Sequence, residues 1–268
     1  MIRHLVRTQN IDPARIHVTG LSAGGAMANV MLATYPEVFA AGAIIGGLPF
    51  GAASSVGEAF ERMQGRNPPS PTALAEKIRQ ASVHKGPWPA VSVWHGTHDQ
   101  TVRARNADQI TDQWLAIHGG PALASHDEAV NGHARKIWHD AKGRSLVEKY
   151  AISGMGHGVP LSLTSDDPLG QAGPFMLETR ISSTARIAHA WGLATEAEIA
   201  ATETVFQTQT TDQPKPQAAP SLLDMARLRS RWNRGETGSG GTGTASSAHA
   251  NKISKVINDA LRAAGLLR

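Results

Sequence analysis

Apolar positions along the first 200 residues form short strand-like runs separated by stretches with helical spacing. Residues 16–19, 40–45 and 89–94 are rich in β-branched and small apolar side chains, which predicts three buried strands. Helical spacing or good helix formers follow at residues 26–33 and 103–118, and residues 2–9 show the spacing of a helix end. These stretches predict a chain that repeatedly passes from strand to helix.

The segment from 48 to 87 lacks a strand signal. Helical stretches near 56–63 and 71–82 are joined by Asn67-Pro68-Pro69, and we interpret the segment as a lid over a functional site. Further on, residues 136–139 and 146–152 predict two strands joined by a turn at 140–143.

The composition changes near residue 201. Residues 202–220 are rich in Thr, Gln and Pro, and residues 235–248 in Gly, Ser and Thr, which predicts a flexible linker over 201–250 with a short basic helix inside it. The final segment, 251–268, has an apolar stripe at helical spacing. We expect that helix to dock on a domain spanning residues 1–200, with binding to a partner or a membrane surface as the alternative.

A nucleophile motif follows the first predicted strand. Gly20-Leu21-Ser22-Ala23-Gly24 fits G-x-S-x-G, and a strand before it with a helix after it is the setting of a nucleophile elbow. A serine at such a sharp turn needs small neighbours two positions away on each side. The backbone N–H of Ala23, at the start of the helix, is then a candidate oxyanion donor. The alternative is a plain Gly-rich turn.

Two more loops at strand ends carry the partners that a serine nucleophile requires. Asp99 follows the strand at 89–94, and His157 lies in a Gly-rich loop after the strand at 146–152. The chain order Ser22, Asp99, His157 is that of α/β-hydrolases. In this hypothesis His157 is the base and Asp99 orients it.

Other residues offer weaker interpretations. His95 and His98 lie beside Asp99, but two histidines without a clear third ligand are poor evidence for a metal. Asp99 could also be an ordinary turn residue, and Asp166 and Asp167 follow His157, which is the wrong order for the acid. We expect surface positions for His133 and His139, and mainly core positions for Trp88, Trp94, Trp138 and Trp191.

Composition narrows the possibilities further. The 268 residues contain no cysteine, which excludes disulfides and thiolate catalysis, and the N-terminus lacks the apolar region of a signal peptide. The net charge of +4 comes largely from residues 214–268, where nine Lys and Arg face three Asp and Glu. Because Gly, Ser and Thr interrupt these charges, we favour a solubilising surface over nucleic-acid binding.

Several of these stretches together carry a family resemblance. These stretches are the segment from Asp12 to Ala28, Tyr35-Pro-Glu-Val-Phe-Ala-Ala-Gly, Trp94-His-Gly-Thr-His-Asp-Gln-Thr-Val and Gly154-Met-Gly-His-Gly-Val-Pro. Over residues 3–193 the chain resembles the esterase/poly(3-hydroxybutyrate) depolymerase family. The resemblance implies an α/β-hydrolase with a mostly parallel sheet and flanking helices. It also implies Ser22 as nucleophile, Asp99 as acid and His157 as base, an ester or polyester substrate, and no cofactor or metal.

The resemblance leaves one departure. In α/β-hydrolases the nucleophile follows the fifth strand, but only fourteen residues precede the first strand here, so the family's first strands and second oxyanion donor are expected to be missing. The strand at 15–19 would then be an open edge available for self-association.

Two functions follow as hypotheses. One is a serine ester hydrolase acting through an acyl-serine intermediate on polyhydroxybutyrate, acetylxylan or feruloyl esters. The other is a catalytically impaired remnant that serves as an interaction module. The resemblance favours an extracellular or periplasmic location, and no transmembrane run is present.

Overall fold

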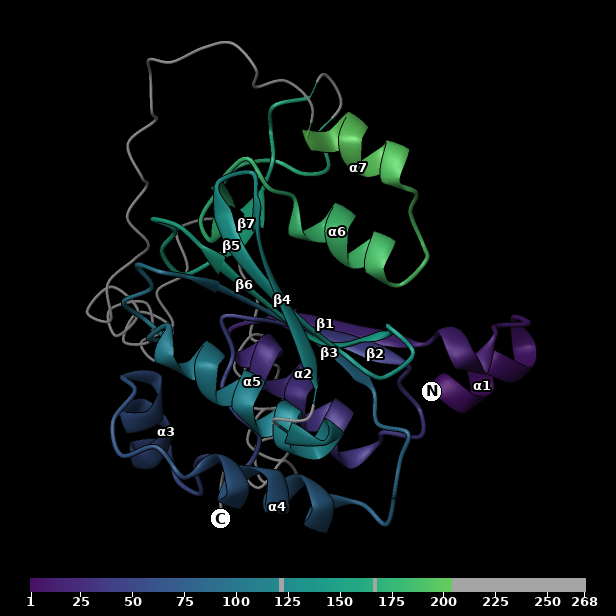
Figure 1. The fold of residues 1–268 in the computed structure, drawn as a ribbon, viewed down its shortest axis with the longest axis vertical. Coiled ribbons are helices and arrows are strands. Elements are labelled where there is room, and N and C mark those ends of the chain that lie inside the picture. The colour runs from purple at the N-terminus through teal and green to yellow at the C-terminus, as the bar shows by residue number, and fades with distance from the viewer. Residues whose placement is uncertain (121–122, 166–167, 204–268) are drawn as a thin grey trace, which may run out of the picture.

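The computed structural model describes residues 1–120, 123–165 and 168–203. These ranges form an α/β fold built on a six-stranded, mostly parallel sheet with flanking helices (Figure 1). The strands of this sheet are β1 (His17–Leu21), β2 (Ala41–Ile45), β3 (Ala90–Gly96), β4 (Ala124–Val130), β5 (His133–His139) and β6 (Ser145–Ile152). The helices are α1 (Ile2–Thr8), α2 (Ala23–Thr34), α3 (Val56–Met63), α4 (Pro71–Ala81), α5 (Arg105–His118), α6 (Ser183–Ala190) and α7 (Glu196–Glu203).

Four parallel strands bring their carboxyl ends to one edge of the sheet. The strand order is β1-β2-β3-β6-β5-β4, in which β1, β2, β3 and β6 are parallel and β5 and β4 continue as an antiparallel meander. Leu21, Ile45, Trp94 and Tyr150 lie side by side in one row across the parallel strands. The loops that follow this row therefore meet at one edge, where open α/β sheets place their ligands.

The predicted strands correspond to β1, β2, β3, β5 and β6, and the turn at 140–143 joins β5 to β6 as expected. β4 was not predicted. Its sequence, Ala-Ser-His-Asp-Glu-Ala-Val, is polar and mostly exposed, so it has no hydrophobic alternation to identify it. It is a strand because it pairs with β5 along seven residues, and its charges are typical of an edge strand.

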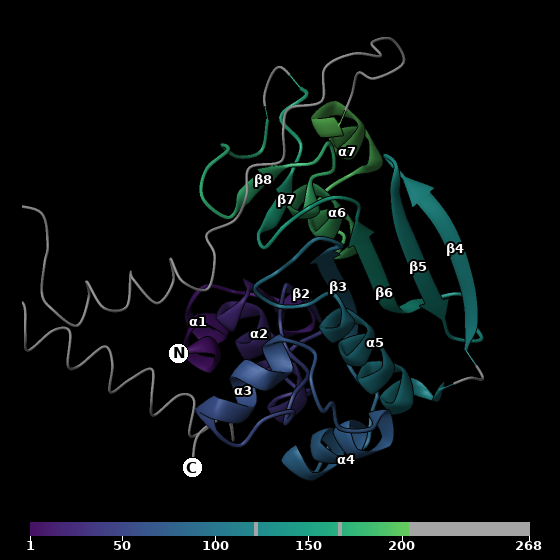
Figure 2. The same ribbon diagram turned by 90° about the vertical axis from the view of Figure 1, so that its left-hand side faces the viewer.

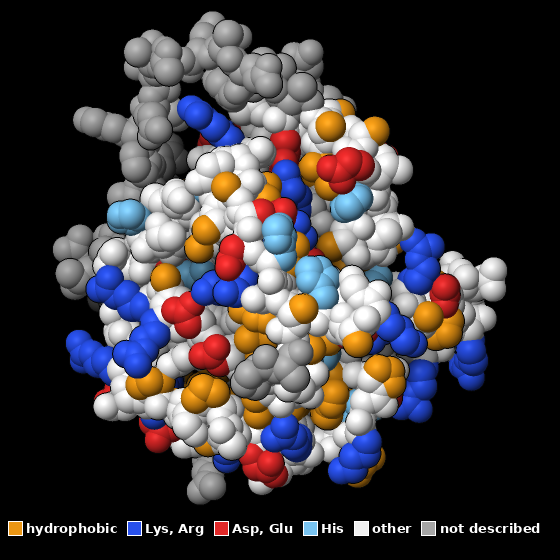
Figure 3. Space-filling model, viewed as in Figure 1, with side chains coloured by type: hydrophobic (Ala, Val, Ile, Leu, Met, Phe, Trp, Pro, Cys, Tyr) orange, Lys and Arg blue, Asp and Glu red, His pale blue; other side chains and the backbone are white. Residues whose placement is uncertain are grey.

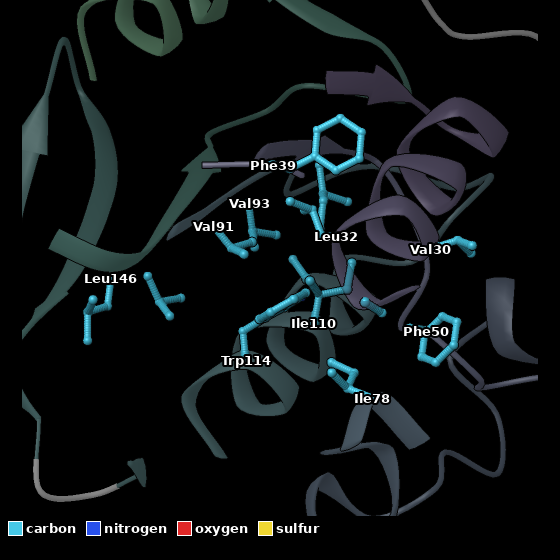
Figure 4. Close-up of a cluster of buried hydrophobic side chains, with 14 residues drawn as sticks. Val30, Leu32, Phe39, Phe50, Ile78, Val91, Val93, Ile110, Trp114 and Leu146 are labelled. Atoms are coloured by element: carbon cyan, nitrogen blue, oxygen red, sulfur yellow. The ribbon is translucent and has the colours of Figure 1, made fainter. Parts of the chain in front are cut away.

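The larger core lies on the face of the sheet that α2, α4 and α5 cover (Figure 4). Leu32 of α2, Ile78 of α4 and Trp114 of α5 are fully buried there against Val93 of β3. Each fully buried side chain of this size stabilises the fold by about 1.5–3 kcal/mol relative to exposure. This face is therefore the main source of stability for the strands that carry the site.

A smaller core lies on the opposite face, under α6. Trp94 stacks on Tyr150 with ring centroids 3.6 Å apart, and Ile181 and Ile187 pack in the same cluster. Beyond the carboxyl ends of the strands lies a separate two-stranded parallel sheet of β7 (Val159–Leu161) and β8 (Met176–Glu178), seen beside α6 in Figure 2. Both faces of the central strands are thus covered, as parallel sheets require.

The interpretation of residues 48–87 as a lid does not hold for α4. Leu74, Ala75 and Ile78 of α4 are buried, and α4 packs against α5 and α2 as part of the larger core. α3 differs, because its C-terminal end lies beside the loop that follows β3: Met63 O accepts a hydrogen bond from Arg103 N at 2.8 Å. The amphipathic pattern of α4 came from burial in the domain itself.

The surface seen in Figure 3 carries hydrophobic side chains in its lower centre, over the C-terminal part of α5. Leu115, Ile117 and Trp138 are only partly buried and pack at the border of the larger core.

α5 is fourteen residues long, and none of the helices described here is long and apolar enough to cross a membrane. The part of the expected linker from 204 to 250 and the helix expected at 251–268 lie outside the described residues.

Candidate active site

Ser22 occupies the sharp turn between β1 and α2. Its backbone has φ 58° and ψ −118°, a conformation that L-residues rarely adopt, and its N–H donates to Ile45 O at 2.8 Å. Strain of this kind persists only where the surroundings hold it in place. The strand–turn–helix geometry predicted for G-x-S-x-G is therefore present.

The sequence predicts that small residues are needed two positions before and two positions after Ser22. The structure requires glycine before the serine as predicted, but one position later than predicted after it. A Cβ on Gly20 would lie 2.2 Å from Gly24 O, so Gly20 must be glycine, as expected. A Cβ on Gly24 would meet nothing within 4 Å, whereas one on Gly25 would lie 2.7 Å from Ile45 O. The crowded position after the serine is Gly25, because Gly25 lies on the side of α2 that faces the end of β2.

The hydroxyl of Ser22 is not used to cap its helix. Ser55, Ser70 and Ser182 also occupy N-cap positions, and each side chain accepts a backbone N–H of its own helix. Ser22 makes no such bond. Its hydroxyl is therefore not committed to the helix that follows, and Ala23 begins α2 with an N–H of the kind that helices leave without an internal acceptor.

Asp99 and His157 form a buried pair. Nδ1 of His157 lies 2.6 Å from Oδ2 of Asp99, and each residue is 2% exposed. The other carboxylate oxygen, Oδ1, accepts the backbone N–H groups of Thr101 and Val102 at 2.8 Å each. Because the carboxylate is an acceptor, Nδ1 of His157 carries a proton, which leaves Nε2 free to act as a base.

The charge state of Asp99 follows from these contacts. Burial opposes ionisation and by itself raises the pKa, but hydrogen bonds from His157 and His95, the charge of His157 and the N–H of Val102 outweigh it. Together they lower the pKa of Asp99 from 3.8 to about 2. The carboxylate is thus ionised at neutral pH.

The loop of His157 is fixed against the loop of Asp99. His98 N donates to Met155 O at 2.9 Å, and Gly154 N donates to the hydroxyl of Thr97 at 2.9 Å. Gly96 packs closely between the two loops, because a Cβ there would lie 2.2 Å from Met155 O. The two loops therefore behave as one unit.

Ser22 and His157 approach each other at the end of β2. Ser22 N is bonded to Ile45 O, and a Cβ on the next residue, Gly46, would lie 3.2 Å from Cε1 of His157. Within the described residues no hydrogen bond joins the Ser22 hydroxyl to His157. Such bonds are often long in ligand-free enzymes and tighten when substrate binds.

His133 was expected at the surface, and that expectation was wrong. It is 7% exposed, its Nδ1 accepts from Ser153 N at 3.0 Å, and its Nε2 lies 2.7 Å from Thr179 O. It ties the end of β6 to the segment after β8. The sequence placed it beside a turn but gave no sign that another segment covers it.

The tryptophans lie mainly in packed positions, as expected, with Trp94 1% exposed and Trp88, Trp138 and Trp191 partly buried. Sequence reasoning missed Phe175, whose ring stands edge-on to His157 at 6.1 Å and borders the site. Asp166 and Asp167 lie outside the described residues, and within the described ranges no three His, Asp or Glu residues form a group that could hold a metal ion.

Comparison with known proteins places this geometry in a family. The sequence model of the esterase PHB depolymerase family matches residues 1–135, half of the chain, a range that includes Ser22 and Asp99. The chain belongs to this family. The resemblance seen in the sequence motifs is thereby confirmed.

Members and neighbours of the esterase PHB depolymerase family are similar over much of the described fold. Poly(3-hydroxyalkanoate) depolymerase C of Paucimonas lemoignei is 37% identical over 195 residues, and an acetylxylan esterase of Coprinopsis cinerea is 32% identical over 170 residues. These matches cover 72% and 61% of this chain but 47% and 44% of the two relatives, so the chain spans about half their length. An acetyl xylan esterase from Aspergillus awamori has the same fold, with a TM-score of 0.56 at 22% identity, covering 72% of this chain and 65% of that one.

Proposed function

We propose that this chain carries the catalytic centre of a serine carboxylic-ester hydrolase. The observation that supports it most is the buried Asp99–His157 pair, 2.6 Å apart, at the same sheet edge as a serine in an elbow conformation. Asp99 orients the imidazole, and Nε2 of His157 accepts the proton of Ser22 as its Oγ attacks an ester carbonyl. The helix start at Ala23 supplies an N–H for the oxyanion that develops.

The reaction then has two stages. In the first, the bond between the carbonyl carbon and the alcohol oxygen breaks, and His157 returns the proton to the leaving alcohol, which leaves an acyl group on Ser22. In the second, His157 takes a proton from water as the water oxygen attacks the acyl carbon; the bond between that carbon and Oγ of Ser22 breaks, His157 returns the proton to Oγ, and the carboxylic acid leaves. No cofactor takes part in this scheme.

The substrate class is proposed from the relatives. Their names are those of a poly(3-hydroxyalkanoate) depolymerase, acetylxylan esterases and feruloyl esterases, all of which point to carboxylic esters. The partly buried Phe175 gives the site an apolar border beside His157, which suits an acyl chain. A poly(3-hydroxyalkanoate) is our first choice because that relative is similar over the larger share of the chain.

The second candidate is an interaction module with an impaired site. One observation favours it: β1, the strand that leads into Ser22, pairs only with β2 among the described strands. In that case the site geometry persists but turnover is slow.

The test is labelling and turnover of the 268-residue chain. A fluorophosphonate should modify Ser22, and hydrolysis of p-nitrophenyl butyrate should fall by about four orders of magnitude or more in Ser22→Ala. Ser125→Ala, on exposed β4, is the matched control and should keep full activity. Equal turnover in Ser22→Ala and Ser125→Ala would refute the hydrolase. A folded chain that neither labels nor hydrolyses would favour the interaction module.

Substrate choice is tested by release of soluble acids from poly(3-hydroxybutyrate), acetylated xylan and methyl ferulate under the same conditions. We expect the polyester to be preferred. Faster turnover of the other two would shift the proposal to a different ester within the same reaction class.

A further inference from the structure

His95 lies on β3, four residues before Asp99, and its side chain is buried with 2% exposure. Its Nε2 is 2.7 Å from Val102 O and 3.4 Å from Oδ2 of Asp99. A carbonyl oxygen can only accept, so Nε2 carries the proton. His95 therefore donates at a point between the backbone of the acid loop and the carboxylate itself.

Val102 is held from both sides by this arrangement. Its N–H donates to Oδ1 of Asp99 at 2.8 Å, and its carbonyl accepts from Nε2 of His95 at 2.7 Å. The turn from Asp99 to Val102 thus closes on itself through two side chains. If the donor at His95 were lost, the Val102 carbonyl would be left buried without it, and the turn that fixes Oδ1 could rotate.

We propose that His95 is a positioning residue for the ester hydrolysis reaction, holding the Asp99–Val102 turn so that Oδ2 stays aligned with Nδ1 of His157. This inference rests on the proposed function of the site. His95 acts through the acid, because its side chain contacts the Asp99 carboxylate and the Val102 carbonyl. It acts by limiting how far the carboxylate can turn.

A metal-binding role does not fit the same residue. Nε2 carries a proton and points at the Val102 carbonyl, so it is not a metal ligand in this arrangement. Nδ1 is buried without a hydrogen-bond partner, but among the described residues no group of three His, Asp or Glu that could hold a metal ion includes His95. Neighbouring His98, by contrast, is exposed, and its Nδ1 lies 3.1 Å from the hydroxyl of Thr97. The two histidines therefore differ in burial and in hydrogen-bond partner.

The experiment compares three variants of the full chain. His95→Phe keeps an aromatic ring but has no donor, His95→Gln keeps a donor near the position of Nε2, and His126→Phe on exposed β4 is the matched control. Mutation of a residue that orients a functional group by hydrogen bonding, as the outer partners of metal ligands do, typically changes activity about 10- to 100-fold. We expect His95→Phe to lower kcat on p-nitrophenyl butyrate by that amount with KM nearly unchanged, and His95→Gln to stay within about threefold of the parent.

A second readout reports the alignment without turnover. The proton between Nδ1 of His157 and Asp99 gives a low-field proton NMR signal, which should shift or broaden in His95→Phe and persist in His95→Gln and His126→Phe. An unchanged signal and kcat in folded His95→Phe would overturn the inference, as would an equal loss in His95→Gln. If His95→Phe does not fold, His95→Asn replaces it, because its shorter amide does not reach Val102 O.

The two readouts also separate this inference from the proposed function. A parent chain that hydrolyses no ester refutes the hydrolase, but the NMR comparison still decides whether His95 aligns Asp99. If the parent hydrolyses esters but its low-field proton signal is the same in His95→Phe, only the positioning role is refuted.

Discussion

The two halves of the site differ in how firmly the sheet holds them. Asp99 and His157 follow β3 and β6, central strands with neighbours on both sides, and both residues are buried and hydrogen-bonded. Ser22 follows β1, which has one neighbour among the described strands and is only partly buried along its length. β2, one strand further in, is buried at every residue.

This difference teaches that one site can combine two sources of precision. The half proposed to act as acid and base, Asp99 and His157 (the acid–base half), is fixed by tertiary hydrogen bonds between loops, such as His98 N to Met155 O. The half proposed to supply the nucleophile, the turn at Ser22 (the nucleophile half), is fixed by backbone geometry, through the crowding of Gly20 and Gly25 and the bond from Ser22 N to Ile45 O. A change in one half should therefore act by a different mechanism from a change in the other.

The largest effects are expected from adding one methyl group to either half. Gly20→Ala places a Cβ 2.2 Å from Gly24 O, and Gly96→Ala places one 2.2 Å from Met155 O. Neither backbone atom can move cheaply, so each variant should lose about 3 kcal/mol or more of unfolding free energy, measured by urea titration, together with activity.

Gly24→Ala is the matched control for Gly20→Ala within the same motif. It has open space around the added methyl and lies in the first turn of α2, so its stability should be unchanged or higher by about 0.5–1 kcal/mol. Similar destabilisation in Gly20→Ala and Gly24→Ala would show that crowding does not set the elbow.

A smaller effect is expected from pH on the acid–base half. Because the pKa of Asp99 is lowered to about 2 in the folded chain, its ionisation stabilises the fold above the unfolded pKa of about 4. This stabilisation, about 2 kcal/mol, is lost as the pH falls from about 4 through 2. Asp99→Asn should remove that part of the pH dependence of unfolding, measured between pH 2 and 5, while Asp127→Asn on exposed β4 should not.

The smallest effect should come from the support of β1 by α6. His17 of β1 stacks on Trp191 with ring centroids 4.5 Å apart, and Arg15 donates to Gly192 O at 3.1 Å. An aromatic pair contributes about 0.5–1.5 kcal/mol beyond its buried area. A double-mutant cycle of His17→Ala and Trp191→Ala should give a coupling of about 1 kcal/mol in thermal unfolding. If the effects of the two single substitutions simply add, the contact between α6 and β1 does not stabilise β1.

Much of this molecule could be predicted because its signals are local. The spacing Gly20-x-Ser22 needs only a strand before it and a helix after it, and the loops of Asp99 and His157 follow strands that are apolar in sequence. Because β1, β3 and β6 are parallel, the loops that follow them bring the three residues to one sheet edge.

The rest depended on contacts that are distant in sequence. β4 is a strand only because β5 pairs with it, and His133 is buried only because the segment around Thr179 covers it. The crowded glycine after Ser22 is Gly25 because of where α2 crosses β2. The helical pattern of 71–82 gave the correct element but not its partner, which is why α4 was taken for a lid.

The bond between Asp99 and His157 also has a meaning for the time course of folding. α5 and the meander β4–β5–β6 all lie between the two residues in the chain, so this bond closes a loop that contains them. Hairpins between strands adjacent in sequence form early, whereas contacts that close long loops form late. During refolding, the appearance of the His157 Nδ1 proton signal should therefore mark the completion of this whole segment, after the meander has already paired.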